Sequence, residues 1–249
     1  MPSLEKYRRD LEYTYAPGIF PAMEALTKRP ECVVRVLLSE KAEGEGAEKL
    51  KALCADKGVR VECADRVLRA ISHKDNCFAA AVTRKWEAPL SGERHIVLHH
   101  ISDNGNLGTI LRTALGMGYR DIAVIRPAAD PWDPHVIRAS MGAVYSLRVR
   151  EYADMEAYLK ENGTRPLFLF MLDTSRPLNE GVRDAGQRFG LVFGNEGAGL
   201  PPEFASLGTA VRIPQTADVD SFNLSIAAAV GMYAFNNAGQ GRETAPGRK

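Results

Sequence analysis

Short apolar runs alternate with amphipathic stretches along the first third of this chain. Apolar runs bounded by polar or breaking residues predict strands at residues 33–38, 59–63 and 78–82. Apolar positions at helical spacing predict helices at residues 21–28, 47–57 and 66–72. Residues 1–16 mix charged and aromatic side chains, which is typical of a short amphipathic helix or a loose arm. This alternation predicts a small parallel or mixed sheet.

The same alternation continues over the rest of the chain. It predicts strands at residues 95–100, 122–125, 145–149, 167–171, 191–193 and 210–213. Helices are predicted after the polar turn at residues 102–106, near residues 134–139 and 154–162, and from Leu224 to about Phe235. The pattern indicates an α/β fold with a mostly parallel sheet and helices on both of its faces.

The segment of residues 87–93 is polar and broken by Pro89 and Gly92, which favours a domain boundary. We therefore predict an N-terminal domain, a linker, a second domain and a tail, at residues 1–88, 89–94, 95–238 and 239–249. The tail is predicted to be disordered because it is rich in glycine and polar residues.

One stretch of the second domain combines several signals of a binding site. The apolar run at residues 191–193 stops at the loop Gly194-Asn195-Glu196-Gly197-Ala198-Gly199, which predicts a buried strand that delivers a glycine-rich loop to a sheet edge. A second strand ends at Pro214, and Ser221 is the predicted N-cap of the last helix. Loops at neighbouring strand ends form a crevice in open α/β sheets. Glu196 and Asn223 indicate that this pocket handles a cation.

Structural roles for the same residues stay open. A glycine loop is commonly an ordinary turn, because glycine is the default residue wherever positive φ is needed. The loop matches neither G-x-G-x-x-G nor G-x-x-x-x-G-K-[ST], so neither dinucleotide nor P-loop chemistry is indicated.

Composition narrows the class of protein. The chain has 249 residues, 45% of them hydrophobic, and a formal net charge of +1, so an RNA partner would have to use a local basic patch. Its apolar runs are too short for a membrane span, and the first residues lack the apolar core of a signal peptide, so we expect a cytoplasmic protein. Cys32, Cys54, Cys63 and Cys77 lack metal-ligand spacing and are expected to be buried thiols without a metal.

Three segments of the second domain resemble the SpoU-type RNA 2′-O-ribose methyltransferases of the SPOUT class. They are residues 106–114 (NLGTILRTA), residues 191–200 (LVFGNEGAGL), and Ile213-Pro214 followed by residues 221–227 (SFNLSIA). Each segment alone is a weak signal, but the three occur in the family's order. Phe222 departs from the pattern, since the family usually has Leu there. Residues 18–82 resemble the L30e-like RNA-binding domain that precedes the catalytic domain in many members.

The resemblance implies a C-terminal trefoil knot whose loops hold S-adenosylmethionine, a homodimer formed through the C-terminal domain, and a structured RNA substrate, ribosomal or transfer RNA. It implies neither a metal nor a membrane partner. The family's catalytic and RNA-contacting positions fall on Asn106, Arg112, Glu196, Ser221 and Asn223. Its cofactor positions fall on Leu172, Asp173, Gly194, Asn195, Gly199, Ile213, Phe222 and Leu224.

The implied reaction moves a methyl group from a sulfonium to a ribose 2′-hydroxyl, which must also lose its proton. A guanidinium holds its protons strongly, so a bidentate clamp on an RNA phosphate suits Arg112 better than the role of general base. The family's proposal that this arginine is the base stays open. Two other functions are weighed against catalysis: an RNA-binding protein of the same fold without activity, and an oxidoreductase with a nucleotide cofactor.

Overall fold

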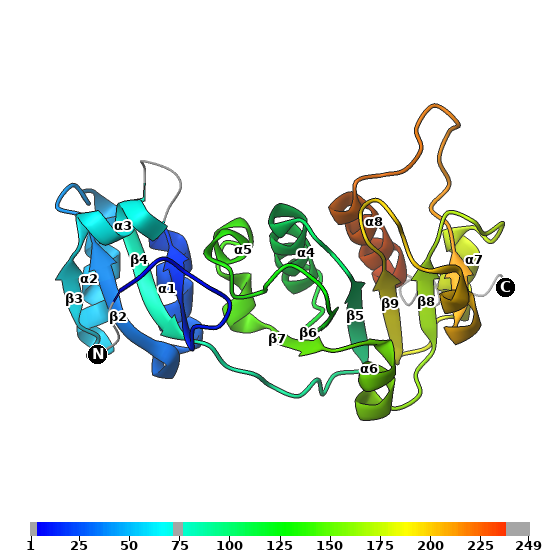
Figure 1. The fold of residues 1–249 in the computed structure, drawn as a ribbon, viewed down its shortest axis with the longest axis horizontal. Helices are drawn as coiled ribbons and strands as arrows, with labels where there is room; N and C mark the ends of the chain where they lie inside the picture. The colour runs from blue at the N-terminus through cyan, green and yellow to red at the C-terminus, as the bar shows by residue number, and fades with distance from the viewer. Residues whose placement is uncertain (1–3, 72–76, 238–249) are drawn as a thin grey trace, which may run out of the picture. The chain divides into compact units, whose positions relative to one another are not determined.

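The computed structural model describes residues 4–71 and 77–237 and divides the chain into two compact units (Figure 1). The first unit consists of Met1–Glu87, Leu107–Arg112 and Asp130–Leu147. The second unit consists of Ala88–Asn106, Thr113–Ala129 and Arg148–Lys249. The predicted tail at residues 239–249 lies outside the described residues.

The first unit contains a mixed four-stranded sheet with the order β1-β4-β2-β3. Its strands are β1 (Tyr13–Pro17), β2 (Val33–Leu38), β3 (Val61–Cys63) and β4 (Ala79–Arg84). Its helices include α1 (Ile19–Lys28), η1 (Pro30–Cys32), α2 (Glu45–Asp56) and α3 (Asp65–Ile71). Strand β4 is antiparallel to both β1 and β2, whereas β3 is parallel to β2. The strands and helices predicted between residues 21 and 82 are therefore found, with ends displaced by up to two residues.

The helix or loose arm predicted for residues 1–16 is wrong at residues 13–16, which belong to strand β1, whereas residues 4–12 form neither a helix nor a strand. Tyr13 and Tyr15 are buried in a cluster with Leu37 and Leu68, and the hydroxyl of Thr14 donates a hydrogen bond to the carbonyl of Trp132. Both faces of the strand are thus covered, which suits aromatic and β-branched residues. A strand of five residues that is buried on both faces shows no alternation of polar and apolar residues, so the sequence did not reveal it beside the charged residues that precede it.

A segment between the strands of the second sheet packs against the first sheet. Helix α5 (Pro134–Ala139) contacts β1, and the 3₁₀ helix η2 (Ala143–Ser146) contacts α1. The Tyr145 hydroxyl lies 3.1 Å from the Thr83 hydroxyl. Gly142, at φ 80, lies so close to Glu24 that a Cβ atom would come within 2.8 Å of the Glu24 Cβ. Chain order alone gives no sign of this packing.

The second unit contains a six-stranded sheet with the order β10-β8-β9-β5-β6-β7, in which every neighbouring pair is parallel. The strands are β5 (Arg94–His99), β6 (Asp121–Ile125), β7 (Arg148–Tyr152), β8 (Leu167–Phe170), β9 (Phe189–Phe193) and β10 (Thr209–Val211). Its helices are α6 (Met155–Asn162), α7 (Leu178–Asp184), η3 (Pro202–Leu207) and α8 (Leu224–Asn237). Helix α4 (Asn104–Gly116) has its two ends in this unit and its middle, Leu107–Arg112, in the first. The predicted α/β class with a mostly parallel sheet is observed.

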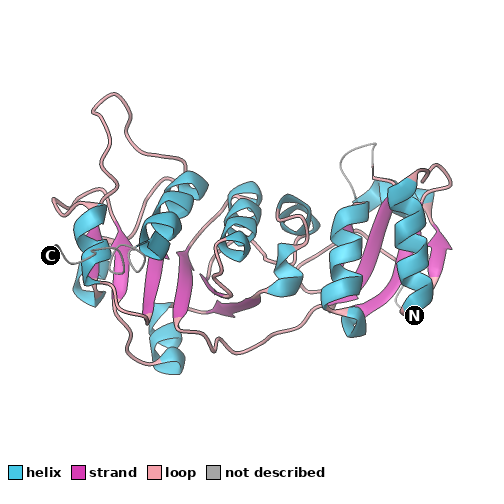
Figure 2. Cartoon of the chain, turned by 180° about the vertical axis from the view of Figure 1, so that it is seen from behind, coloured by secondary structure: helices cyan, strands magenta, loops and turns pink. Residues whose placement is uncertain are grey.

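Helices α4 and α8 lie next to each other, and α6 lies apart from both (Figures 1 and 2). The Asn236 side chain of α8 donates a hydrogen bond of 2.7 Å to the carbonyl of Met117, the residue that caps α4. Among the described residues, each helix is too short or too polar to cross a membrane.

Two predictions for this unit need correction. The strand predicted at residues 145–149 begins at Arg148, because Tyr145 belongs to η2 and is buried there. Helix α7 was not predicted, since its sequence LNEGVRD is polar and contains Gly181. That glycine is needed because any side chain at this position would run into Val211.

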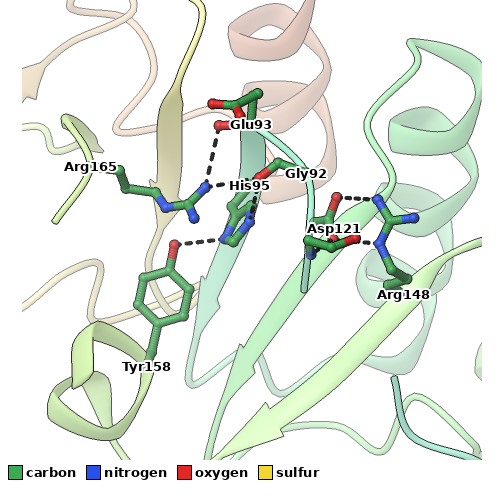
Figure 3. Close-up of polar contacts among 8 residues, drawn as sticks. Gly92, Glu93, His95, Asp121, Arg148, Tyr158 and Arg165 are labelled. Carbon is green, nitrogen blue, oxygen red and sulfur yellow. Dashed lines mark hydrogen bonds and ion pairs between the residues drawn. The ribbon is translucent and has the colours of Figure 1, made fainter. Parts of the chain in front are cut away.

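Polar side chains lock the amino edge of the second sheet, where β5 and β6 begin (Figure 3). The His95 ring is bonded at both nitrogens: Nδ1 lies 3.0 Å from the Tyr158 hydroxyl, and Nε2 lies 3.1 Å from the carbonyl of Gly92. Burial lowers the pKa of His95 to about 4, so the ring is neutral near pH 7. These contacts fix the linker at Gly92, just before β5 begins.

An ion pair completes this edge. The Arg148 guanidinium donates two hydrogen bonds of 2.7 and 2.6 Å to the Asp121 carboxylate, which also accepts from the Ser91 amide. Burial alone would raise the pKa of Asp121, but the bonds from Arg148 and Ser91 outweigh it and lower that pKa. A side chain at Gly92 would collide with the Asp121 carboxylate, so the linker backbone lies directly against the pair.

Candidate active site

The loops at the carboxyl edge of the second sheet hold most of the predicted site residues. All six strands are parallel, and so the chain segments that follow β5, β8, β9 and β10 leave the sheet at the same edge.

The glycine-rich loop is a tight turn organised by the Asn195 side chain. The Asn195 Oδ1 accepts hydrogen bonds from the amides of Gly197 and Ala198 at 2.9 and 3.0 Å, and its Nδ2 donates to the carbonyl of His100 at 2.8 Å. A Cβ atom at Gly194 would overlap the backbone of Gly199. The loop is therefore a turn that requires glycine, as one interpretation of the sequence had it, and it also presents its backbone at the sheet edge.

Glu196 anchors this loop to the start of α4. Its carboxylate accepts hydrogen bonds from the Ser102 amide and hydroxyl at 3.0 and 2.9 Å, from the Asp103 amide at 3.0 Å, and from the Asn106 side chain at 3.3 Å. Burial would raise the pKa of Glu196, but the hydrogen bonds from backbone amides outweigh it and lower the pKa. The carboxylate is thus ionised and its acceptor positions are occupied, which makes it a fixed partner of Asn106.

The hydrogen bonds continue from Asn106 to the last helix. The Asn223 side chain donates to the Asn106 Oδ1 at 3.1 Å. Its own Oδ1 accepts from the amide and the hydroxyl of Ser225 at 2.9 and 2.6 Å. Asn223 is therefore the residue that caps α8, and the predicted cap Ser221 is wrong, because the helix begins three residues later, at Leu224.

A pocket beside this chain of contacts collects most of the predicted cofactor residues. It is lined by Leu172, Gly194, Asn195, Gly199, Ile213, Phe222 and Leu224, together with Glu196 and Ser221. Asp173 is not among its lining residues, since the pocket is bounded there by Leu172. The sequence prediction missed eight further lining residues: Phe170, Met171, Phe193, Gly197, Val211, Arg212, Gln215 and Ala227. The first two stand at the end of a predicted strand, which could have indicated them.

Arg112 lies on α4 beyond Asn106 and is exposed. Within the part of the chain that the structure describes, its guanidinium has no hydrogen bond or ion pair. The structure thus leaves this cation available to a ligand.

A second and larger cavity of about 770 Å³ lies at the carboxyl ends of β5, β6 and β9. We call it the His99 cavity; its lining residues are His99, His100, Ser102, Pro127, Ala128, Ala129, Asn195 and residues 198–202. The rings of His99 and His100 are stacked with centroids 3.7 Å apart. Burial, and then the neighbouring His100, lower the pKa of His99 to about 4. The sequence prediction missed both histidines, although two histidines at the end of a predicted parallel strand were a usable signal.

The cysteines partly depart from the prediction. Cys54 and Cys77 are buried, Cys32 is intermediate and Cys63 is exposed at the end of the short edge strand β3. Cys63 is near Glu40 and Asp65, which is the one group of potential metal ligands among the described residues. Asp65 already accepts hydrogen bonds from the Ser39 hydroxyl and the Glu40 amide, so this cluster is explained as a loop contact.

Comparison with known proteins identifies the family. The profile of the SpoU rRNA methylase family matches residues 93–233. The chain belongs to this family. Over 150 residues it is 33% identical to an uncharacterized tRNA/rRNA methyltransferase of Synechocystis, an alignment that covers 59% of this chain and 55% of the relative. Over 148 residues it is 32% identical to a 23S rRNA (adenosine(1067)-2′-O)-methyltransferase of Streptomyces laurentii, covering 58% of this chain and 54% of the relative. The chain thus spans about half the length of these two relatives.

A solved structure of an rRNA methyltransferase matches over nearly the whole chain. The AdoMet-bound rRNA methyltransferase of Sinorhizobium meliloti superposes with a TM-score of 0.75 at 25% identity, and the match covers 94% of this chain and 89% of that one. The recognition of the SpoU family from the three sequence segments is therefore confirmed.

Proposed function

We propose that this SpoU family member transfers a methyl group from S-adenosylmethionine to a ribose 2′-hydroxyl in ribosomal or transfer RNA. The observation that carries the proposal is the adjacency of two features at one sheet edge. The pocket with the predicted cofactor residues includes Glu196, and Glu196 holds Asn106, which in turn is bonded to Asn223. The 2′-O activity named for the Streptomyces laurentii relative supports the same reaction.

The pocket suits the cofactor chemically. Leu172, Ile213 and Phe222 supply an apolar wall of the kind that an adenine ring needs, and the glycine loop supplies backbone groups. The ionised Glu196 carboxylate lines the same pocket, so its charge favours a sulfonium. When bound, S-adenosylmethionine would supply the methyl group.

The side chains next to this pocket act on the ribose. Asn106 is held in one orientation by Glu196 and Asn223, so it presents fixed polar groups to a hydroxyl at no cost of reorganisation. Ser221 lines the pocket from the loop before α8 and assists in this positioning. Arg112, exposed on α4, clamps an RNA phosphate, and the 2′-hydroxyl proton passes to that phosphate or to water.

The first unit binds the RNA substrate in this proposal. Its mixed sheet and flanking helices carry the segment that resembles L30e-like RNA-binding domains. The cytoplasmic location expected from the sequence belongs to the same proposal.

A homodimer through the second unit completes the proposal. Ile226, Val230 and Tyr233 on α8 are exposed although they are large and apolar. Their spacing of four and three residues puts them on one helix face, which a second copy of the chain would cover. Light scattering of the full chain at micromolar concentration should give twice the mass of the monomer, and Tyr233→Glu should shift it to the monomer.

The test of the activity uses the full chain, S-adenosylhomocysteine and RNA. Calorimetry should show binding of S-adenosylhomocysteine and none of NAD. Ribose-methylation mapping of RNA from cells with and without the gene should reveal a site that depends on it. Binding of NAD instead of S-adenosylhomocysteine, or unchanged ribose methylation, would overturn the proposal.

A further inference from the structure

The His99 cavity is large, and no role in cofactor binding or ribose positioning has been given to it. Its volume of about 770 Å³ is within the range of small-molecule sites, which are mostly apolar with a few convergent polar groups. Pro127, Ala128 and Pro201 give it apolar walls, while the imidazoles of His99 and His100 are its main polar groups. Such walls suit a flat ligand with a hydrogen-bonding edge.

Two neighbouring residues of this cavity, His99 and His100, each have a feature that destabilises the folded state. The His99 side chain is 7% exposed, and its Nδ1 atom has no hydrogen-bond partner among the described residues. A buried polar atom without a partner costs about 1–3 kcal/mol. His100 has φ 56, a left-handed conformation that favours glycine. Unsatisfied polar groups and strained backbone conformations of this kind gather at binding sites.

The cavity adjoins the groups that position the ribose. Asn195 and Gly199 line both this cavity and the cofactor pocket. Ser102 lines the cavity and donates two hydrogen bonds to Glu196, the carboxylate that holds Asn106. A ligand in the cavity is therefore separated from the methyl-transfer site only by the glycine loop and the Ser102 contact.

We propose that the His99 cavity receives the base of the RNA nucleotide whose ribose is methylated. This inference rests on the proposed function. Sequence-specific recognition of RNA targets unpaired bases, which stack on aromatic or histidine side chains and bond through their edges. The stacked His99 and His100 rings provide the platform. Ser102 and Asn195, which also line the cavity, provide polar groups for the base edge.

Two variants separate base recognition from folding. His99→Phe keeps a ring against Phe204, which tilts against His99 at 4.6 Å, but removes the nitrogen. His100→Gly removes one stacked ring and suits φ 56, so its melting temperature should equal or exceed that of the unmodified protein. Stacking of one base is worth about 1–3 kcal/mol, so His100→Gly should raise the KM for RNA about tenfold. His99→Phe keeps an aromatic ring and should raise the KM less. Affinity for S-adenosylhomocysteine should stay within about twofold.

His95→Gln is the matched control, because it changes a buried histidine on the same strand at the opposite edge. It should lower the melting temperature and leave the KM for RNA unchanged. If the unmodified enzyme methylates RNA and both cavity variants keep its KM, the inference is overturned while the proposed function stands.

A direct binding measurement tests the cavity even if no RNA is methylated. The probes are the four nucleoside 5′-monophosphates and S-adenosylhomocysteine, and the readout is the imidazole nitrogen signals of His99 and His100 in NMR. A nucleotide should shift both signals in protein saturated with S-adenosylhomocysteine. Shifts caused by S-adenosylhomocysteine alone, with no response to any nucleotide, would assign the cavity to the cofactor and overturn the inference.

Discussion

His95 and His99 stand on the same strand, four residues apart, and they mark the two edges of the second sheet. Both are buried, and burial lowers both pKa values to about 4. They differ in their partners: both His95 nitrogens are bonded, whereas the Nδ1 atom of His99 has no partner among the described residues. The same residue type at the same burial thus completes a structural network at one edge and borders a cavity at the other.

The difference teaches that burial alone does not identify a functional histidine. At the amino edge, Asp121 and Arg148 also satisfy each other, and Gly92 closes the approach to them. At the carboxyl edge, the loops leave two cavities with polar groups turned toward them. Unsatisfied groups and open space together indicate the site.

The largest expected effect is on catalysis at the carboxyl edge. Asn106→Ala removes the group held between Glu196 and Asn223, and loss of one preoriented polar group typically costs about 100- to 1,000-fold in kcat. Single-turnover methylation measures the loss, while calorimetry with S-adenosylhomocysteine should show nearly unchanged affinity. A variant with full turnover would remove Asn106 from the mechanism.

At the amino edge the expected loss is in stability. Arg148→Ala leaves the Asp121 carboxylate, whose side chain is 2% exposed, without its cation, which typically costs about 3–5 kcal/mol. Arg150→Ala is the matched control, because its ion pair with Glu161 has side chains that are 30% and 37% exposed and should contribute less than about 1 kcal/mol. Urea unfolding compares the two variants. Equal losses of unfolding free energy in the two variants would mean that the Asp121–Arg148 pair contributes no more to stability than an ordinary surface ion pair.

The pH dependence of stability follows from the lowered pKa of the buried histidines. His95 and His99 bind protons near pH 6.5 in the unfolded chain and only near pH 4 in the folded chain, so unfolding takes up protons between these values. The free energy of unfolding should therefore fall as the pH drops from about 6.5 to 4, by on the order of 3 kcal/mol for His95. His95→Gln should flatten this dependence, although it is less stable at pH 7. An unchanged slope in urea unfolding would show that His95 is protonated in the folded protein.

The smallest expected effect concerns Arg112, which separates a phosphate clamp from a general base. Lysine keeps the positive charge but loses the bidentate geometry, so Arg112→Lys should weaken RNA binding about tenfold and retain partial turnover. Arg112→Ala should be worse in both respects, since a hydrogen bond to a charged group is worth about 1.5–3 kcal/mol. RNA affinity and single-turnover rates decide between the roles. Full RNA affinity without turnover in Arg112→Lys would favour the base.

The sequence was sufficient where a signal is local. Apolar runs located the strands. The three spaced segments, one of which contains the glycine loop, located the carboxyl edge and many residues of the cofactor pocket. It failed where long-range packing decides. Strand β1 depends on pairing with β4, α7 depends on the space beside Val211, and the cap moved from Ser221 to Asn223 because Asn223 meets Ser225.

His99 shows a different limit. The sequence does not distinguish a strand-end histidine whose ring nitrogen meets a hydroxyl, as in His95, from one whose nitrogen has no partner among the described residues, as in His99. The two cases are distinguished by segments far from β5 along the chain: Tyr158 of α6, which bonds to His95, and the loops that follow β6 and β9, which line the cavity at His99.

The position of the pocket residues along the chain also determines when the pocket can form during synthesis. Its walls come from the ends of β8, β9 and β10 and from the start of α8, so they are the last parts of the second sheet to leave the ribosome. A nascent or truncated chain that lacks α8 has no complete pocket and gains nothing from the cofactor. A ligand that binds only the finished fold stabilises it by mass action. S-adenosylmethionine, as the proposed cofactor, would thus stabilise only chains that have folded through α8.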